Sequence, residues 1–382
     1  MTTTIAPPSR PHEDPDDAPR AGTVTAELPK VSPPPREIPR RINVRTRDDY
    51  ASVLYSAVTA LGLVWLVYYH LLPFSGRLGF VLTWWLCFLA LYATVSAISN
   101  PAPVVIDRVV SAVLQSVAAV VGIALVSTIV FIFVKGWPAI HHWNFYSQDM
   151  SGIRPTDPLT KGGIRHAMTG TAIEVGIATL ISLPLGVATA VYMIEVRGKL
   201  AQVVRTVVEA MTALPDILAG LFIYTVFIIG FQWERTGFTV SLALSVTMIP
   251  IIARATDVAL RVVPGGLREA SLALGASQWQ TVRRVVLPTA RSGIVTALIL
   301  GVARVTGESA PLLIVSAASS FQNNNPFHQP MNSLPLYIFL AITSGEDNYV
   351  ARGYGAASVL LFIVLVLFVL ARFFARSRVR PR

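Results

Sequence analysis

The stretch "ARVTGESAPLLIV", residues 303–315, places an arginine and a glutamate inside an apolar run. Arg304 and Glu308 stand four positions apart, so on a continuous helix they share one face. A guanidinium group is a planar fork of N–H donors that suits an oxyanion, and a nearby carboxylate can hold this fork when no anion is present. Thr306 and Ser309 add hydroxyl groups, although only some of the four side chains can face one side. The combination is suited to an anion that passes through an apolar element.

A second interpretation of the same residues is a structural ion pair. A charged residue at the centre of a membrane helix costs about 2.5–3.5 kcal/mol on insertion scales, and it normally faces a bundle interior or an aqueous path. Arg304 would then pair with a residue of another helix or of another subunit, without contact to a transported ion. The residue types and their spacing leave both interpretations open.

The elements that must position these residues are apolar and long. The chain has 382 residues, of which 53% are hydrophobic and 14% charged, with a mean hydropathy of +0.58. A helix needs about 20 apolar residues to cross a hydrocarbon core of about 30 Å. The sequence therefore predicts an all-α polytopic membrane protein with eight spans, at 51–72, 79–99, 109–134, 167–194, 208–231, 238–259, 289–316 and 353–375.

Lysine and arginine are distributed unevenly among the connections between these segments. Cytoplasmic loops of membrane proteins carry the excess of basic residues. With both termini in the cytoplasm, few basic residues fall on the opposite side, namely Arg77, Lys135, Arg154, Lys161, Arg165, Arg235 and Arg352. We expect a multi-pass protein of the cytoplasmic membrane with cytoplasmic N and C termini. This topology also accounts for the net charge of +10, so the expected partner is the lipid bilayer and no nucleic acid.

The loop at residues 261–288, "RVVPGGLREASLALGASQWQTVRRVVLP", has more pattern than a linker. Its two halves have helical spacing, Gly275 separates them, and Pro288 begins the next span. Such a pair of short amphipathic helices can insert into a cleft of a soluble protein. A helical hairpin in the lipid headgroup layer would equally explain Trp279 and Arg284. Both interpretations remain open from the residues alone.

The same loop resembles a known signature. Glu269 and Ala270, then Gly275, then Leu287 and Pro288 are spaced as in the EAA motif of binding-protein-dependent ABC importer permeases, with Ser271 at the second alanine and Val285 at the isoleucine. In that family the motif forms coupling helices that dock in a groove of a cytoplasmic ATPase. The resemblance implies this ATPase-coupling role for Glu269, Ala270, Ser271, Gly275, Leu287 and Pro288.

Other stretches resemble the phosphate permeases of the PstA type. "MTALPDILAGLFIY" is similar to a helix-breaking segment of that family, and "GESAPLLI" is similar to its "GETAPLL", where the sister PstC type more usually reads "GETMA". The resemblance implies import of inorganic phosphate with a PstC-type permease, a PstB-type ATPase dimer and an external PstS-type phosphate-binding protein. The arginine and glutamate of this motif are associated with translocation in the family, which favours a pathway role for Arg304 and Glu308.

The resemblance also implies a division of the chain. A type I ABC importer permease core of six transmembrane helices would be preceded by an extra N-terminal transmembrane hairpin, eight helices in total. We expect a disordered, proline-rich cytoplasmic tail at 1–49, the additional hairpin at 50–108, the first core helix and external loop at 109–165, the permease domain at 166–376 with its coupling loop at 261–288, and a basic cytoplasmic tail at 377–382.

Two further charges depart from the family pattern. Asp216 stands where the family tends to have serine, directly after Pro215, and we interpret it as a cap of the resumed helix. Glu174 stands where an apolar residue is commoner, and we expect it in the bundle interior. With Arg304 and Glu308, these carboxylates leave the spans net negative, so some of them must pair, protonate or face away from an anion path.

The sequence contains no Walker-type glycine loop, nucleophile elbow or zinc motif. We therefore expect no catalytic residue, no cofactor and no metal, and the adjacent His141 and His142 have no third ligand to make a metal site. ATP hydrolysis would belong to a separate chain. The alternatives are an ABC permease for another oxyanion or solute, and a structural or sensory membrane protein without transport activity.

Overall fold

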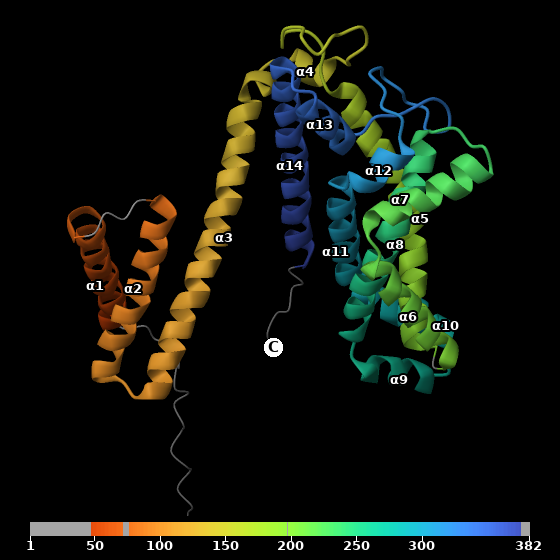
Figure 1. Ribbon diagram of the computed structural model, residues 1–382. Helices are drawn as coiled ribbons and strands as arrows, with labels where there is room; N and C mark the ends of the chain where they lie inside the picture. The colour runs from red at the N-terminus through yellow and green to blue at the C-terminus, as the bar shows by residue number, and fades with distance from the viewer. Residues whose placement is uncertain (1–46, 72–75, 197, 376–382) are drawn as a thin grey trace, which may run out of the picture. The chain divides into compact units, whose positions relative to one another are not determined.

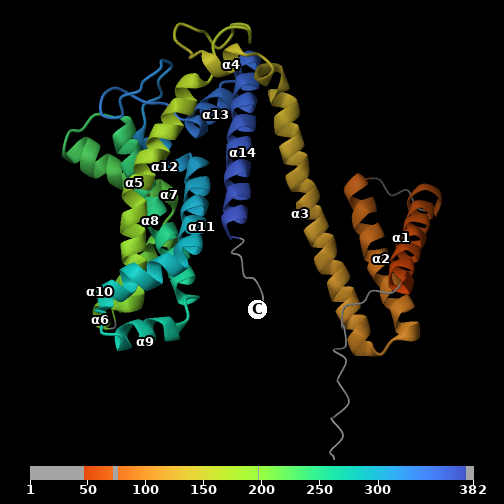
Figure 2. The same cartoon turned by 180° about the vertical axis from the view of Figure 1, so that it is seen from behind.

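The computed structural model describes residues 47–71, 76–196 and 198–375, and in these residues the regular elements are all helices. The chain divides into two compact units, Met1–Ser116 and Val117–Arg382. Figures 1 and 2 show the helices of each unit from two sides. Most of the predicted tail at 1–49 and the whole of 377–382 lie outside the described residues, and residues 47–49 begin the first helix.

The first unit contains a helical hairpin. Helix α1 (Arg47–Leu66) continues as the π-helical turn η1 (Val67–Leu71), and α2 (Arg77–Ser99) returns beside it. The Trp84 indole N–H donates to the Ala57 carbonyl at 3.1 Å, and Ala60 is buried between the helices. The outward side chains of both helices are apolar and exposed, as on a helix pair that faces lipid.

The second unit begins within α3 (Ala102–Ile140) and holds the remaining elements. The elements α4 and α13 lie at one end of the unit and α9 and α10 at the other, with α5, α8 and α11 running between them (Figures 1 and 2). The bounds are α4 Asn144–Ser147, α5 Arg165–Glu195, α6 Lys199–Ala213, α7 Asp216–Ile223, η2 Tyr224–Gly230, α8 Gly237–Arg261, α9 Gly265–Ala273, α10 Gln278–Thr281, η3 Val282–Val286, α11 Leu287–Thr306, α12 Ala310–Val315, α13 Leu334–Thr343 and α14 Asp347–Ala375.

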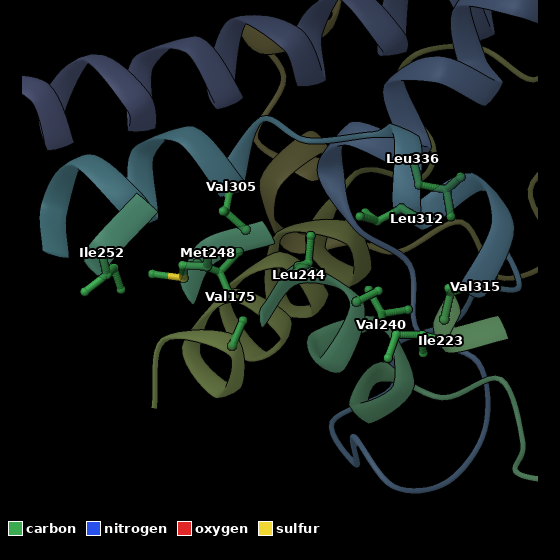
Figure 3. Close-up of a cluster of buried hydrophobic side chains, with 12 residues drawn as sticks. Val175, Ile223, Val240, Leu244, Met248, Ile252, Val305, Leu312, Val315 and Leu336 are labelled. Carbon is green, nitrogen blue, oxygen red and sulfur yellow. The ribbon is translucent and has the colours of Figure 1, made fainter. Parts of the chain in front are cut away.

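Helix α8 is the central element of the second unit, because it packs against α5, α7 and α11. Small residues permit this close approach, as expected for membrane helices. A methyl group on Gly186 of α5 would stand 2.8 Å from the Ile252 side chain of α8. Figure 3 shows the buried cluster around α8, to which α5, α7, α11, α12 and α13 all contribute: Val175, Ile223, Val240, Leu244, Met248, Ile252, Val305, Leu312, Val315 and Leu336.

Seven helices among the described residues are long and apolar enough to cross a membrane, and the bent pair formed by 199–213 and 216–230 raises this to eight if it counts as one span. The predicted span at 208–231 contains a break, as its resemblance to a helix-breaking segment implies, and the helices on either side of the break are bent by 102°. The break falls at Leu214 and Pro215. Proline has no N–H for the helix and disfavours helical geometry in the residue before it.

The predicted segment at 289–316 is also broken. Helix α11 ends at Thr306, and α12 restarts at Ala310 with Pro311 in its first turn. Gly220 of α7 allows α12 to approach, since a methyl group there would stand 2.7 Å from Pro311 Cα. Two further helices differ from the predicted spans. Helix α13 lies between the predicted spans 289–316 and 353–375, and α3 has 39 residues where a span of 109–134 is predicted. The length of α3 is about 58 Å at 1.5 Å per residue.

Candidate functional site

Arg304 forms an ion pair with Asp216 at the meeting point of the two helix breaks. Arg304 lies in the last turn of α11, and Asp216 is the first residue of α7. The distance from Arg304 Nη2 to Asp216 Oδ2 is 3.5 Å, and the two side chains are 59% and 31% exposed. The Arg304 side chain is therefore only partly covered by the other described residues of this chain.

The interpretation of Asp216 as a helix cap is wrong in its detail. Pro215 occupies the N-cap position and α7 has no side-chain cap hydrogen bond. Asp216 is an acidic residue in the first turn, where the helix dipole favours negative charge, and its carboxylate is directed to Arg304. A carboxylate directly after a proline break in an apolar span was the sequence signal for such a partner.

Glu308 is placed differently from the expectation. It does not share a helical face with Arg304, because α11 ends two residues before it. Its backbone N–H donates to the Val305 carbonyl at 3.1 Å. The Glu308 carboxyl nevertheless interacts with Asp216 and is close enough to Arg304 to be influenced by its charge. Arg304, Asp216 and Glu308 thus form one charged cluster through the chain reversal between α11 and α12.

A cavity of about 490 Å³ opens beside this cluster. We call it the arginine cavity, because both Arg254 and Arg304 line it. Its lining residues come from α6, α7, α8 and α11: Met211, Thr212, Asp216, Thr247, Ile251, Arg254, Ala255, Val258, Leu300 and Arg304. The cavity combines two permanent cations with apolar walls, which suits a transient anion.

Thr306 and Ser309 are not brought into this cavity. Thr306 is buried, and its hydroxyl donates to the Val302 carbonyl at 2.6 Å. It lines a different cavity, of about 530 Å³, with Thr171 and Thr179. Ser309 is half-buried directly before α12. Of the four residues predicted for the pathway, the structure brings together Arg304 and Glu308.

Glu174 lies in the interior, as predicted. It is 1% exposed within α5, and its Oε1 has no hydrogen-bond partner among the residues that the structure describes. It does not line the arginine cavity. The sequence left the spans with a net negative charge, which disfavours an anion. Because Glu174 lies outside the arginine cavity, its carboxyl group does not face an anion in that cavity.

The coupling loop contains the two short helices that the sequence predicts. Helix α9 is followed by Gly275, whose φ of 83° is in the left-handed region that glycine adopts readily. Ser277 then caps α10 in a capping box with Gln280. Ser271 stands where the family has alanine, and its hydroxyl oxygen lies 2.9 Å from the hydroxyl oxygen of Thr281. This hydrogen bond joins the two helices of the loop.

The loop is attached to the transmembrane helices at defined points. Arg268 Nε lies 3.3 Å from Glu195 Oε1 at the end of α5, an ion pair without hydrogen-bond geometry. Arg268 Nη2 donates to the Leu260 carbonyl of α8 at 3.1 Å. Gln278 Nε2 donates to the Glu195 carbonyl at 2.7 Å. These contacts connect α9 and α10 to α5 and α8.

Four large apolar side chains of α9, α10 and the turn between these helices are exposed at the end of the second unit. They are Leu267, Leu272, Leu274 and Trp279, and we call them the coupling surface; Leu274 is 88% exposed. Glu269 and Ala270 are exposed beside them. Val282 and Val286 instead are buried and anchor the loop. Exposed apolar groups concentrated on an ordered loop mark a binding surface.

At the opposite end, hydrogen bonds connect the segment between α4 and α5 to α14 and to the segment between α12 and α13. Arg352 is buried, and its Nη2 donates to the carbonyls of Asp157, Pro158 and Lys161 at 2.9–3.0 Å. The backbone N–H of Gln322 donates to Asp149 Oδ2 at 2.9 Å. Burial alone would raise the pKa of Asp149, but hydrogen bonds from Ser151 and Gln322 outweigh it and lower the pKa. Sequence reasoning missed Arg352 as a structural residue, because it was counted only as a loop charge.

The arrangement of these helices defines a class of protein: a multi-helix membrane protein with an ordered docking loop at one end. Residues 182–380 match the family described as "Binding-protein-dependent transport system inner membrane component". The chain belongs to this family. It is a multi-pass component of a membrane transport system, and the resemblance drawn from the EAA motif is confirmed.

Two named relatives narrow the comparison. The chain is 37% identical over 262 residues, 68% of this chain and 84% of the relative, to "Phosphate transport system permease protein PstA 1" of Mycobacterium tuberculosis. It is 33% identical over 268 residues, 69% of this chain and 92% of the relative, to "Phosphate transport system permease protein PstA" of Haemophilus influenzae.

The fold also has a counterpart among solved structures. A chain of a bacterial alginate ABC transporter, crystallised with a periplasmic protein bound to an alginate pentasaccharide, aligns with a TM-score of 0.52 at 17% identity. The alignment covers 71% of this chain and 96% of that chain. The predicted all-α ABC importer permease fold is thus confirmed.

Proposed function

We propose that this chain is the PstA-type permease subunit of an ATP-driven importer of inorganic phosphate. The family membership and the two relatives named as phosphate transport permeases support this function. The observation that carries it is Arg304, a permanent cation that remains 59% exposed beside a cavity within an otherwise apolar bundle. An arginine within a membrane helix normally faces a bundle interior or an aqueous path.

Arg304 acts in this proposal as a passing site for phosphate. Its guanidinium fork binds two oxygens of the ion. Glu308 and Asp216 balance the charge of Arg304 when no phosphate is present, which keeps the pathway from becoming a deep anion trap. Thr306 and Ser309 belong to the same helix reversal and support its geometry. Most substrate selectivity resides in an external phosphate-binding protein of the PstS type.

The coupling surface docks on a PstB-type ATPase dimer, with Glu269, Ala270, Ser271, Gly275, Leu287 and Pro288 forming the motif that carries the contact. ATP hydrolysis takes place on that separate chain. Closure of the ATPases moves α9 and α10, and the contacts of Arg268 and Gln278 pass this motion to α5 and α8. A homologous PstC-type permease completes the pathway.

The topology follows from the docking loop. Since the coupling surface meets a cytoplasmic ATPase, the end of the unit that carries α9 and α10 faces the cytoplasm, and the end with α4 and α13 faces outward (Figure 1). The distribution of basic residues supports a chain in the cytoplasmic membrane with both termini inside.

Uptake of labelled phosphate by cells that lack other phosphate importers tests the proposal. Removal of this chain should abolish phosphate uptake and leave sulfate and molybdate uptake unchanged. Unchanged phosphate uptake would sink the proposal, and selective loss of another oxyanion would reassign the substrate.

A copurification experiment separates transport from a purely structural role. After gentle solubilisation an ABC ATPase should accompany the chain, and Glu269→Lys should weaken this association because it inverts an exposed charge on α9. Recovery of the chain without any ATPase would favour a structural or sensory protein.

A further inference from the structure

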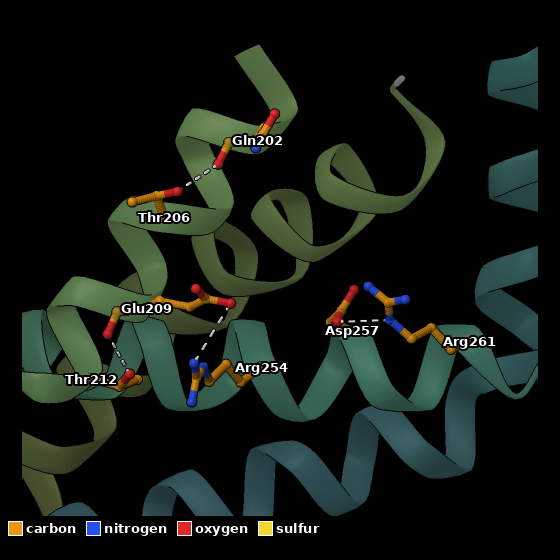
Figure 4. A network of polar contacts seen from close by, with 7 residues as sticks. All are labelled: Gln202, Thr206, Glu209, Thr212, Arg254, Asp257 and Arg261. Carbon is orange, nitrogen blue, oxygen red and sulfur yellow. Dashed lines mark hydrogen bonds and ion pairs between the residues drawn. The ribbon is translucent and has the colours of Figure 1, made fainter. Parts of the chain in front are cut away.

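A second arginine shares the cavity with Arg304. Arg254 of α8 lines the arginine cavity, and its Nη2 lies 3.9 Å from Glu209 Oε1 of α6. Their side chains are 52% and 57% exposed. Figure 4 shows this pair, with the Asp257–Arg261 pair further along α8. Neither Arg254 nor Glu209 has a role in the pathway described above.

The two arginines are paired in the same way. Both come from helices that run through the unit, α8 and α11, whereas their carboxylates come from the two halves of the broken span. Glu209 precedes the 102° bend and Asp216 follows it. Charge-assisted hydrogen bonds are about 2.7–2.9 Å long, so separations of 3.9 Å and 3.5 Å describe loosely held pairs. Both arginines also remain more than half exposed.

The two arginines lie at different depths along the unit. Arg254 stands seven positions before the end of α8 at Arg261, about 10 Å at 1.5 Å per residue. Arg304 stands 17 positions after the start of α11 at Leu287, about 26 Å by the same geometry. Both of these helix ends adjoin the coupling loop. Arg254 therefore lies nearer to the coupling loop than Arg304 does.

We propose that the arginine cavity holds two successive anion-binding stations, Arg304 and then Arg254, and that Asp216 and Glu209 are tethered anions that occupy these arginines until a passing phosphate replaces them. This inference rests on the proposed function. It adds roles for Arg254, Glu209 and Asp216, and it adds the direction in which phosphate is released. Phosphate leaves Arg304 for Arg254 and then for the side of the coupling loop.

Exchange between anions explains how a site with permanent cations releases its ion. Each guanidinium stays paired at every stage, with a carboxylate or with phosphate, so no unpaired arginine is left beside the apolar walls. A displaced carboxylate remains close by on its helix, which gives it an effective concentration in the millimolar range or higher. Asp216 and Glu209 therefore compete with phosphate, weaken its binding and speed its release.

Transport by the complete importer in proteoliposomes tests this inference. The importer is purified with all its subunits, and ATP-driven uptake of labelled phosphate is measured over a range of concentrations. Arg254→Gln should lower the maximal rate about tenfold, the factor expected for one lost charge-assisted contact. Asp216→Asn should lower both the KM and the maximal rate about threefold or more, because phosphate binds more tightly and leaves more slowly once its competitor has lost its charge.

The matched control is Asp257→Asn, which weakens the 2.9 Å ion pair between Asp257 and Arg261 on the same helix but outside the cavity lining. This variant should transport as the wild type does. Equal defects in Asp257→Asn and Arg254→Gln would overturn the inference, because loss of any ion pair on α8 would then suffice. Unchanged kinetics in Arg254→Gln, or a raised KM in Asp216→Asn, would also overturn it.

Two further measurements keep the outcomes separate. If Arg254→Gln fails to assemble, Arg254→Lys replaces it; this variant keeps the charge without the fork, and it should transport at an intermediate rate, whereas a wild-type rate would contradict a bidentate station. If the wild-type importer carries no phosphate, the proposed function fails. If the wild type carries phosphate and the cavity variants match it, only the two-station inference fails.

Discussion

Arg304 Nη2 and Asp216 Oδ2 lie 3.5 Å apart, and this pair joins the two places where transmembrane helices are broken. Arg304 lies in the last turn of α11, before the chain reverses into α12. Asp216 is the first residue of α7, after the bend at Pro215. The two breaks also touch through Gly220 and Pro311. The charged cluster therefore lies at two helix interruptions, a feature that membrane proteins tolerate where it is buried in protein or lines a cavity.

The coupling surface should lose its partner when its most exposed side chain is changed. Leu274→Ser removes an apolar group that is 88% exposed, so the chain itself should fold and insert normally. Anchors of this kind are worth about 2 kcal/mol or more to an interface, which corresponds to ATPase binding weakened by tenfold or more. Copurification of the ATPase at graded concentrations measures this change.

The control for this prediction is Trp143→Ser, which changes an apolar residue of similar exposure, 81%, beside α4 at the opposite end of the unit. ATPase binding should be retained in Trp143→Ser. Equal loss in the two variants would show that exposed apolar groups matter only for general stability.

The contact between Glu195 and Arg268 should affect coupling more than assembly. Glu195→Gln removes the charge that faces Arg268 Nε at 3.3 Å, while the Glu195 carbonyl still accepts from Gln278. The loop should then follow the ATPase without moving α5 fully. We expect ATPase binding to persist and the number of ATP molecules hydrolysed per phosphate to rise several-fold. A wild-type ratio in the variant would show that this contact transmits no motion.

The close approach at Gly170 predicts a position-specific loss of stability. A methyl group on Gly170 of α5 would collide with the backbone carbonyl oxygen of Asn332, so Gly170→Ala forces backbone to move. Overpacking of this kind costs about 1–3 kcal/mol. Gly176→Ala on the same helix meets nothing within 4 Å and should be neutral or gain up to about 1 kcal/mol from helix propensity. Thermal unfolding of the two variants in detergent compares them, and equal midpoints would contradict the packing described.

The sequence was sufficient for the large elements because their signals are local. Apolar length identified the spans, and the spacing of Glu269, Gly275 and Pro288 identified the docking loop with its two helices. Burial of Glu174 also followed from one charge in an apolar segment. These features need no knowledge of which helices are neighbours.

The break between α11 and α12 and the pairing of Arg304 could not be obtained in the same way. Gly307 and Pro311 lie in an apolar run whose length suggests one span, so the end of α11 at Thr306 was missed and Glu308 was placed on the wrong face. The partner of Arg304 stands 88 positions earlier in the chain, on a different helix. Such long-range pairs depend on tertiary packing, as does the sharing of one cavity by Arg254 and Arg304.

The most direct test of the proposed pathway is phosphate uptake by Arg304→Gln in an assembled importer. Glutamine keeps much of the side-chain length but removes the charge and the fork. The side chain is 59% exposed, so the complex should assemble with its ATPase. The account predicts that phosphate uptake falls at least tenfold, while ATPase association is unchanged. Wild-type uptake by Arg304→Gln would remove Arg304 from the pathway and contradict the account.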